Sequence, residues 1–205
     1  METILLFDYD GVIVDSMPLV LELLQTLAPK YGLDMIKTRK DVEDLFEKNV
    51  YESLKELGLD DKKLNHFKEK LGVKLLLLQS HLNPFPNIKE SLEKISTNNR
   101  MIMITSNLSF VTNHFLKKHK LNFFEKVLGA EVSKSKVEKI LNIKQENPNA
   151  KLFYIGDTTG DIYEGKKAKI KTVGVTWGYH SKNRIKKAKP DHVVNNPNDL
   201  VKLFT

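Results

Sequence analysis

The sequence predicts an α/β protein in which a parallel sheet carries helices on both faces and a small all-helical module follows the first strand. In residues 84–205, short apolar runs alternate with amphipathic helical segments, a pattern that builds parallel sheets covered by helices. Between Ser16 and Asn83 the patterns are helical. We therefore expect residues 1–15 and 84–205 to form the sheet-containing core, and residues 16–83 to form the helical module.

The first strand is expected at Ile4–Phe7, a short continuous apolar run. Apolar residues at helical spacing then predict helices over 17–28, 39–57 and 60–82, the last with a break near Gly72. Two prolines in Asn83–Asn87 end the helical module. The remaining elements are expected in this order: helix 88–95, strand 101–104, helix 110–119, strand 126–129, helix 136–145, strand 152–155, helix 161–168, and strands 172–175 and 192–194.

Composition restricts the class of protein. A chain of 205 residues with 40% hydrophobic and 29% charged residues suits a soluble globular protein with one sizeable core, or one core plus a small accessory domain. The absence of cysteine excludes disulfides, thiolate catalysis and zinc–thiolate sites. The start of the chain shows no leader pattern, and the longest apolar stretch, Leu71–Leu78, contains Lys74 and is too short to cross a bilayer. We expect a cytoplasmic protein that does not interact with membranes.

The formal charge of +7 suits either a nucleic-acid partner or lysines spread over solvated helix faces. The local clusters lie at 117–120, 166–169 and 182–187, and none is interleaved with aromatic residues as a base-stacking surface requires. The solvated-face interpretation is favoured, so no specific nucleic-acid partner is expected.

Asp8 and Asp10 follow the first strand, and Gly11 comes directly after them. In an extended chain, side chains two residues apart lie on the same face, so both carboxylates leave the strand end together. Like charges this close need a cation, a shared proton or solvent, and a divalent metal is one such cation. A plain helix cap and turn would use the same residues, and this stretch alone leaves both interpretations open.

Three further strand ends carry polar residues. Thr105–Asn107 offers hydroxyl, amide and backbone N–H groups that suit either an anion or an ordinary helix cap. Lys134 and Lys136 precede a helix, where the helix dipole disfavours a cation unless an anion is near. Asp157 ends a strand, and Asp161 stands one helical turn later, so both can face one cleft.

Together these segments resemble the four motifs of the haloacid dehalogenase superfamily of phosphohydrolases. Asp8–Ser16 looks like the first motif, Ser106 the second, a lysine near 134 the third, and Gly156–Asp161 the fourth, in the family's order. The helical module resembles the cap inserted between the first two motifs. The segments 174–179 and 190–194 are similar to phosphoglycolate phosphatase-like members. The resemblance implies a Rossmann-like catalytic core with a helical cap.

The third motif departs from the family because no proline follows its lysine. Lys134 is preferred because its distance from Asp157 suits the family, and Lys136 stays open as the alternative.

The resemblance also implies a magnesium-dependent phosphatase of a small phosphorylated metabolite, either phosphoglycolate-like or a sugar phosphate. Asp8 would be the nucleophile that forms an aspartyl-phosphate, and Asp10 the general acid and base. The implied site residues are: Asp8, Asp10 and Asp157 for Mg²⁺; Ser106, Asn107 and Lys134 for phosphate; and Asp161, Thr158 and Gly11 in support, Gly11 as part of the hinge into the cap.

Alternatives remain open. A phosphomutase would share this machinery, and a non-catalytic nucleic-acid or regulatory binding protein could keep the fold. A dehalogenase is disfavoured because a halide leaves without the proton that Asp10 supplies. Phe46, Asn49, Tyr51 and Glu52 are candidates to line the cleft, although amphipathic helices explain them equally well. Either a monomer or a homodimer is compatible with the sequence.

Overall fold

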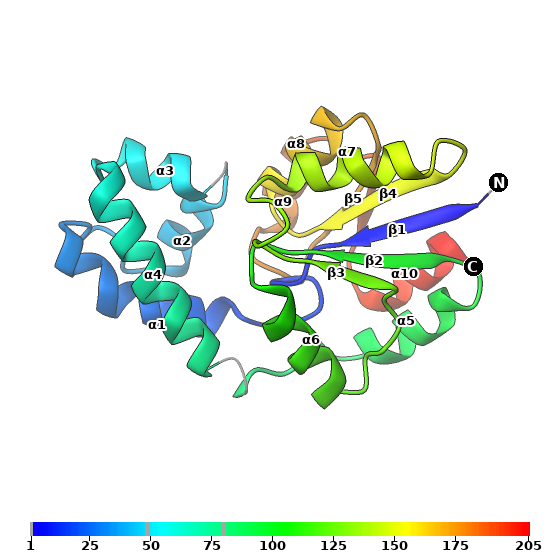
Figure 1. Cartoon of the computed structure of the whole chain (residues 1–205), viewed down its shortest axis with the longest axis horizontal. Helices are drawn as coiled ribbons and strands as arrows, with labels where there is room; N and C mark the ends of the chain where they lie inside the picture. The colour runs from blue at the N-terminus through cyan, green and yellow to red at the C-terminus, as the bar shows by residue number, and fades with distance from the viewer. Residues whose placement is uncertain (1, 48–49, 79–80) are drawn as a thin grey trace. The chain divides into compact units, whose positions relative to one another are not determined.

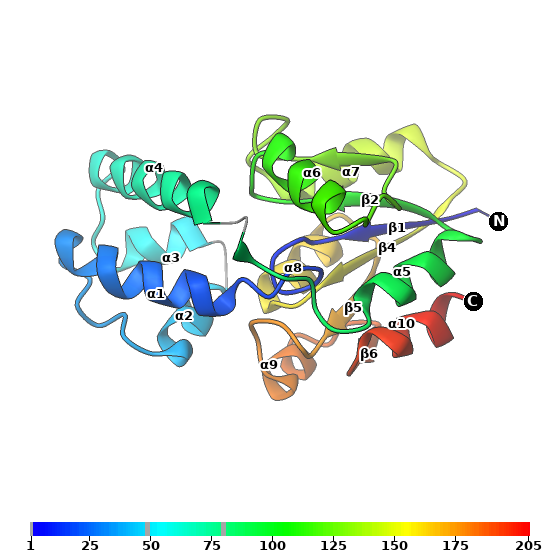
Figure 2. The same ribbon diagram turned by 90° about the horizontal axis from the view of Figure 1, so that it is seen from below.

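The computed structural model describes residues 2–47, 50–78 and 81–205. The chain forms two compact units, one made of Met1–Asp15 with Asn83–Thr205 and the other of Ser16–Leu82. In the described part of the first unit, six parallel strands form one sheet in the order β3-β2-β1-β4-β5-β6 (β1–β5 are labelled in Figure 1 and β6 in Figure 2). The strands are β1 (Thr3–Phe7), β2 (Arg100–Ile104), β3 (Lys126–Leu128), β4 (Lys151–Gly156), β5 (Lys171–Val175) and β6 (His192–Val194).

The order of the strands places the ends of β1 and β4 at the centre of the sheet. From β1 the chain moves outward through β2 and β3, then returns to β4 on the other side of β1 and continues through β5 to β6. Phe7, the last residue of β1, is in register with Met103 on one side and Ile155 on the other. Ligands of open parallel sheets bind at the carboxyl ends of the strands where the order reverses, which here lies between β1 and β4.

Helices cover both faces of this sheet, as the sequence predicts, and the fold class is confirmed. Figure 1 shows α7 and α8 over one face of the sheet and α5 and α10 over the other. Figure 2 shows α5 and α10 side by side. The helices of this unit are α5 (Ile88–Ser96), α6 (Ser109–Lys118), α7 (Lys136–Glu146), α8 (Thr159–Lys167), α9 (Lys182–Lys187) and α10 (Pro197–Phe204).

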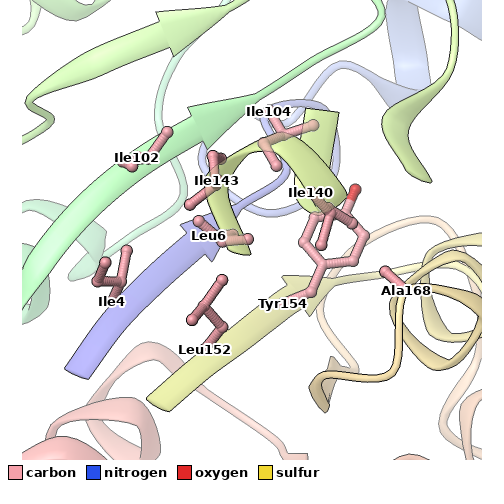
Figure 3. Close-up of a cluster of buried hydrophobic side chains, with 9 residues drawn as sticks. All are labelled: Ile4, Leu6, Ile102, Ile104, Ile140, Ile143, Leu152, Tyr154 and Ala168. Carbon is pink, nitrogen blue, oxygen red and sulfur yellow. The ribbon is translucent and has the colours of Figure 1, made fainter. Parts of the chain in front are cut away.

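Alternate residues of the central strands form the core beneath α7. Figure 3 shows Ile4 and Leu6 of β1 beside the corresponding side chains of β2 and β4, facing Ile140 and Ile143 of α7. Side chains two residues apart on a strand share a face, so each central strand supplies one row to this layer. Tyr154 of β4 belongs to the same cluster and is fully buried. Its hydroxyl group reaches the polar site described below.

The second unit contains α1 (Met17–Leu27), the short 3₁₀ helix η1 (Ala28–Tyr31), α2 (Arg39–Leu45), α3 (Val50–Glu56) and α4 (Asp61–Leu78). The single helix expected over 39–57 is therefore two helices, and their shared apolar spacing explains why the pattern resembled one. The break expected near Gly72 does not occur, because α4 continues through it. Residues 48–49 and 79–80, parts of two expected helices, lie outside the described residues, as does the proposed cleft residue Asn49.

Two helices of the first unit, α9 and α10, were not predicted. The chain does contain their start signals. The side chain of Ser181 accepts from the Arg184 N–H at the start of α9, and that of Asn196 accepts from the Asp199 N–H, with Pro197 in the first turn of α10. Across the described ranges, no helix has the length and apolar character required to cross a membrane.

Candidate active site

Asp8 and Asp10 extend beyond the carboxyl end of β1. The N–H of Asp8 continues the ladder by donating to the carbonyl of Ile155 at 2.9 Å. Between the two aspartates, Tyr9 is buried and packs edge-on against Phe115 with ring centroids 5.4 Å apart. The side chain of Tyr9 therefore belongs to the core, whereas Asp8 contacts Lys136 and Asp10 contacts Asn107.

Lys136 connects Asp8 with the fourth motif. Its Nζ lies 2.8 Å from Asp8 Oδ2 and 2.8 Å from Asp161 Oδ1. Lys134, the preferred lysine of the sequence, is exposed and lies before Ser135, the N-cap of α7. The structure therefore favours Lys136, the alternative that the sequence left open, because Lys136 is the first residue of α7 and its side chain is the one of the two that contacts Asp8.

The carboxylate of Asp161 has all its acceptor positions occupied. Oδ1 accepts from Lys136 and, at 3.0 Å, from the hydroxyl of Tyr154. Oδ2 accepts from the N–H and the hydroxyl of Thr158, while Thr158 Oγ1 accepts from the Asp161 N–H, which completes a capping box at the start of α8. Burial raises the pKa of Asp161, but Lys136 and Thr158 outweigh that effect and hold the pKa below its usual value. Asp161 is therefore an ionised anchor for Lys136.

Asp157 has the opposite character. Its Oδ2 accepts from the Tyr179 N–H at 2.7 Å, whereas its buried Oδ1 has no hydrogen-bond partner among the described residues. Burial raises the pKa of Asp157 well above its ordinary value, and the carboxylates of Asp161 and Asp8 raise it further. A buried carboxylate oxygen without a partner is costly, so Oδ1 is a position where a ligand would be stabilising.

These observations fit a divalent cation. Asp8, Asp157 and Asp161 offer oxygen atoms that all lie within 4.8 Å of one another. Burial, assisted by Asp161 and Asp10 and opposed by Lys136, raises the pKa of Asp8 to about 8. One ammonium cannot balance three buried carboxylates, and carboxylate oxygens are the ligands that Mg²⁺ prefers. Because the acceptor positions of Asp161 are occupied, Asp8 and Asp157 are the carboxylates that could hold the ion.

The second motif lies next to Asp10. Asn107 Nδ2 donates to Asp10 Oδ2 at 2.6 Å, and Ser106 is exposed. Residues 105–107 do not form an ordinary helix cap. The N-cap of α6 is Leu108, whose side chain makes no capping hydrogen bond. The N–H of Ser109, the first residue of α6, is bound instead by Glu131.

Lys139 lies beside the candidate site, and the sequence did not predict its position there. Its side chain is buried, and Nζ donates to the carbonyls of Thr105 at 2.8 Å and Leu128 at 3.3 Å, which lie at the ends of β2 and β3. Burial, with the charge of Lys136, lowers its pKa to about 8. The available signal was its position on the apolar face of α7, one residue before Ile140, where an unpaired lysine would be unfavourable.

His180 was also missed. Its backbone N–H donates to the carbonyl of Asp157 at 3.2 Å, and its Nδ1 accepts from the Thr159 N–H at 3.0 Å. The residue is buried, and it thereby links the loop after β5 to the start of α8. The preceding segment, 174–179, carries only a family resemblance, and no local pattern in the sequence indicates this role for His180.

The parallel sheet, with its acidic cluster at the carboxyl ends of β1 and β4, defines a protein of the haloacid dehalogenase type. A model of the haloacid dehalogenase-like hydrolases matches residues 5–175, and the chain belongs to this family of hydrolases. The resemblance found from the motifs is therefore confirmed.

Particular relatives agree with this assignment. The chain is 27% identical to a phosphoglycolate phosphatase from Synechococcus elongatus over 209 residues, covering 98% of this chain and 96% of that protein. It is 26% identical to a pyrophosphatase from Anoxybacillus flavithermus over 217 residues, covering 98% and 95%. The fold is similar to that of a haloacid dehalogenase-like hydrolase from Streptococcus pneumoniae, with a TM-score of 0.84, 19% identity, and coverage of 100% and 99%.

Substitution of Gly11 should disturb the acidic cluster directly. Gly11 has φ +74°, and a Cβ there would overlap the carboxyl group of Asp157. We expect Gly11→Ala to lower the free energy of unfolding by about 2 kcal/mol or more, measured by urea denaturation, because strain and steric overlap add.

Gly32→Ala is the matched control. Gly32 has φ +78°, but a Cβ there would have no atom within 4 Å, so only the backbone strain of about 1 kcal/mol applies. Equal destabilisation by the two variants would show that Gly11 is not required for its approach to Asp157.

Proposed function

We propose that the protein is a magnesium-dependent phosphatase that hydrolyses a small phosphorylated metabolite, either phosphoglycolate-like or a sugar phosphate, through an aspartyl-phosphate. The observation that carries this proposal is the position of Asp8, whose carboxylate is bound by Lys136 on one side and lies in one cluster with the unpartnered oxygen of Asp157 on the other. A buried carboxylate held in this way is positioned as a nucleophile rather than as a structural ion pair alone.

Two steps follow from the residues present. Asp8 attacks phosphorus, the bond to the leaving oxygen breaks, and Asp10 gives its proton to that oxygen. Asp10 then removes a proton from the water that attacks the phosphoryl group, and release of phosphate restores the Asp8 carboxylate. Asn107, which donates to Asp10, would orient it for both transfers.

Charge is balanced by the surrounding groups. Asp8, the backbone carbonyl of Asp10 and Asp157 would hold Mg²⁺, which when bound lowers the repulsion between a carboxylate and a phosphate. Ser106, Asn107 and Lys136 would bind the phosphoryl oxygens, and Lys136 replaces Lys134 in this role because of its contact with Asp8. Asp161, with Thr158, would keep Lys136 in position.

The substrate is proposed at the level of a class. The relatives named phosphoglycolate phosphatase and pyrophosphatase suggest that both phosphate monoesters and pyrophosphate belong in a substrate screen. We also predict that the partner is a small metabolite, that the helical unit is a cap, and that the protein is cytoplasmic.

The test measures inorganic phosphate released from phosphoglycolate, sugar phosphates, p-nitrophenyl phosphate and pyrophosphate, ranked by kcat/KM, with Mg²⁺ and with EDTA. We expect release that needs Mg²⁺ and a phosphate monoester at the top of the ranking. Equal rates in EDTA would contradict the metal-dependent mechanism. Isomerisation of a sugar phosphate without net release would indicate a phosphomutase, and no turnover on any substrate would favour a binding protein.

A further inference from the structure

A hollow lined by lysines lies at the edge of the sheet opposite the carboxyl ends that lead to Asp8 and Asp157. Its volume is about 790 Å³, within the range of roughly 300–1,000 Å³ that is typical of small-molecule pockets. It is formed where β4 and β5 begin and where α7, α8 and α9 end. Six lysines line it: Lys144, Lys151, Lys166, Lys169, Lys171 and Lys189.

Two of these lysines are positioned by the carboxyl ends of helices. Lys144 Nζ donates to the carbonyls of Ala168 at 3.2 Å and Lys169 at 2.9 Å, just after α8. Lys166 Nζ donates to the carbonyl of Ala188 at 2.6 Å, just after α9. An ammonium group has three donors, so each of these lysines retains at least one for a ligand.

Among the described residues that line the hollow, the one acidic side chain is that of Asp191, and its carboxylate is paired with a lysine. Its carboxylate accepts from Lys171 Nζ at 2.7 Å and from the N–H and hydroxyl of Thr172 at 2.9 and 3.1 Å. The other three lysines, Lys151, Lys169 and Lys189, form no ion pair within the ranges that the structure describes.

The charges in the hollow do not cancel. The ends of α7, α8 and α9 contribute about half a negative charge each, and Asp191 contributes one, so the six lysines leave a net positive charge of about three and a half. Positive charge gathered around a concave surface raises the local concentration of anions. A ligand with a single phosphate group would leave most of this charge unbalanced.

We propose that this hollow binds a small anion carrying a chain of phosphate groups, at a site separate from the proposed active site. The lysines come from several segments and surround one concavity, which suits a compact ligand. A single-stranded nucleic acid requires a groove that follows its backbone, with aromatic side chains on which successive bases stack. Among the described residues that line the hollow, the aromatic rings are those of Phe153 and His192, whose centroids lie 6.3 Å apart. One such pair does not form a row on which successive bases could stack.

Backbone geometry provides a variant that removes charge without threatening the fold. Lys169 and Lys189 have φ +55° and +52°, a left-handed conformation that asparagine adopts more readily than lysine. The double variant Lys169→Asn with Lys189→Asn therefore removes two charges at positions where the backbone favours the new residue. Lys120→Asn is the matched control, because Lys120 has φ +56° and does not line the hollow.

The experiment titrates the full chain with inorganic tripolyphosphate in EDTA by calorimetry. We expect saturable binding to the wild type, weakened at least about tenfold in the double variant and changed less than about twofold by Lys120→Asn. Thermal unfolding and hydrolysis of p-nitrophenyl phosphate, measured for each variant, should stay as in the wild type.

Three results would overturn the proposal. The wild type could fail to bind tripolyphosphate. The double variant could bind it as tightly as the wild type, which would place the ligand elsewhere, including at the acidic cluster. A single-stranded oligonucleotide could bind more tightly than tripolyphosphate and lose that affinity in the double variant, which would make the hollow part of a nucleic-acid surface.

Discussion

Replacing Asp8 with asparagine should lower kcat for p-nitrophenyl phosphate by at least about a thousand-fold, because a neutral amide cannot form the aspartyl-phosphate. Asp8 lies in the one set of buried carboxylates, found among the described residues, that could hold a metal ion. The measurement is phosphate release at saturating Mg²⁺.

The fold should survive this change. Lys136 loses its ion pair with Asp8 but keeps the one with Asp161. The amide oxygen of asparagine can keep the 2.8 Å hydrogen bond from the Tyr9 N–H, and one source of carboxylate repulsion is removed. We expect the unfolding temperature to change by no more than a few degrees. Asp34→Asn, the same chemical change at an exposed position outside the four motifs, should leave turnover as in the wild type. Undiminished activity in Asp8→Asn would exclude Asp8 as the nucleophile.

The second large effect distinguishes two lysines that lie two residues apart. Lys136→Met should lower kcat/KM by roughly 100- to 1,000-fold, the usual effect of removing one group that stabilises charge in a transition state. Lys136 is nearly buried between Asp8 and Asp161, so its loss should also lower the free energy of unfolding by about 3–5 kcal/mol. Kinetics and urea denaturation measure the two effects separately.

Lys134→Met is the matched comparison, with the same change of charge in the same loop. Because Lys134 is exposed, we expect its kcat/KM to stay within about twofold of the wild type and its stability within about 0.5 kcal/mol. A larger loss in Lys134→Met than in Lys136→Met would return Lys134 to the role that the sequence favoured.

Much of the fold could be predicted because its signals are local. Each of the six strands of the described sheet corresponds to an apolar run in the sequence, and the alternation with helices indicated their parallel pairing. The helices that were missed, α9 and α10, are six and eight residues long, too short for a strong periodic pattern. The continuity of α4 through Gly72 shows that one glycine, at a cost of about 1 kcal/mol, does not end an amphipathic helix.

The candidate site divides in the same way. Asp8 with Asp10, and Asp157 with Asp161, could be identified because each pair follows the carboxyl end of a central strand. Asp8, Asp157 and Asp161 lie in one cluster, and Asp10 contacts Asn107. The supporting residues could not. The hydroxyl of Tyr154 and the ammonium of Lys139 belong to elements whose apolar pattern indicated a core, and only their packing shows which polar atoms they contact.

By itself the sequence determined the sheet, its strand ends and the two acidic pairs, since these depend on short-range chain geometry. Only the tertiary structure decided that Lys136 rather than Lys134 contacts Asp8, because the start of α7 directs that side chain towards β1. It also gathered six lysines from separate segments around one hollow, where the sequence showed only scattered basic clusters. Contacts between residues far apart in the chain depend on how the helices pack against the sheet, and no local spacing records that packing.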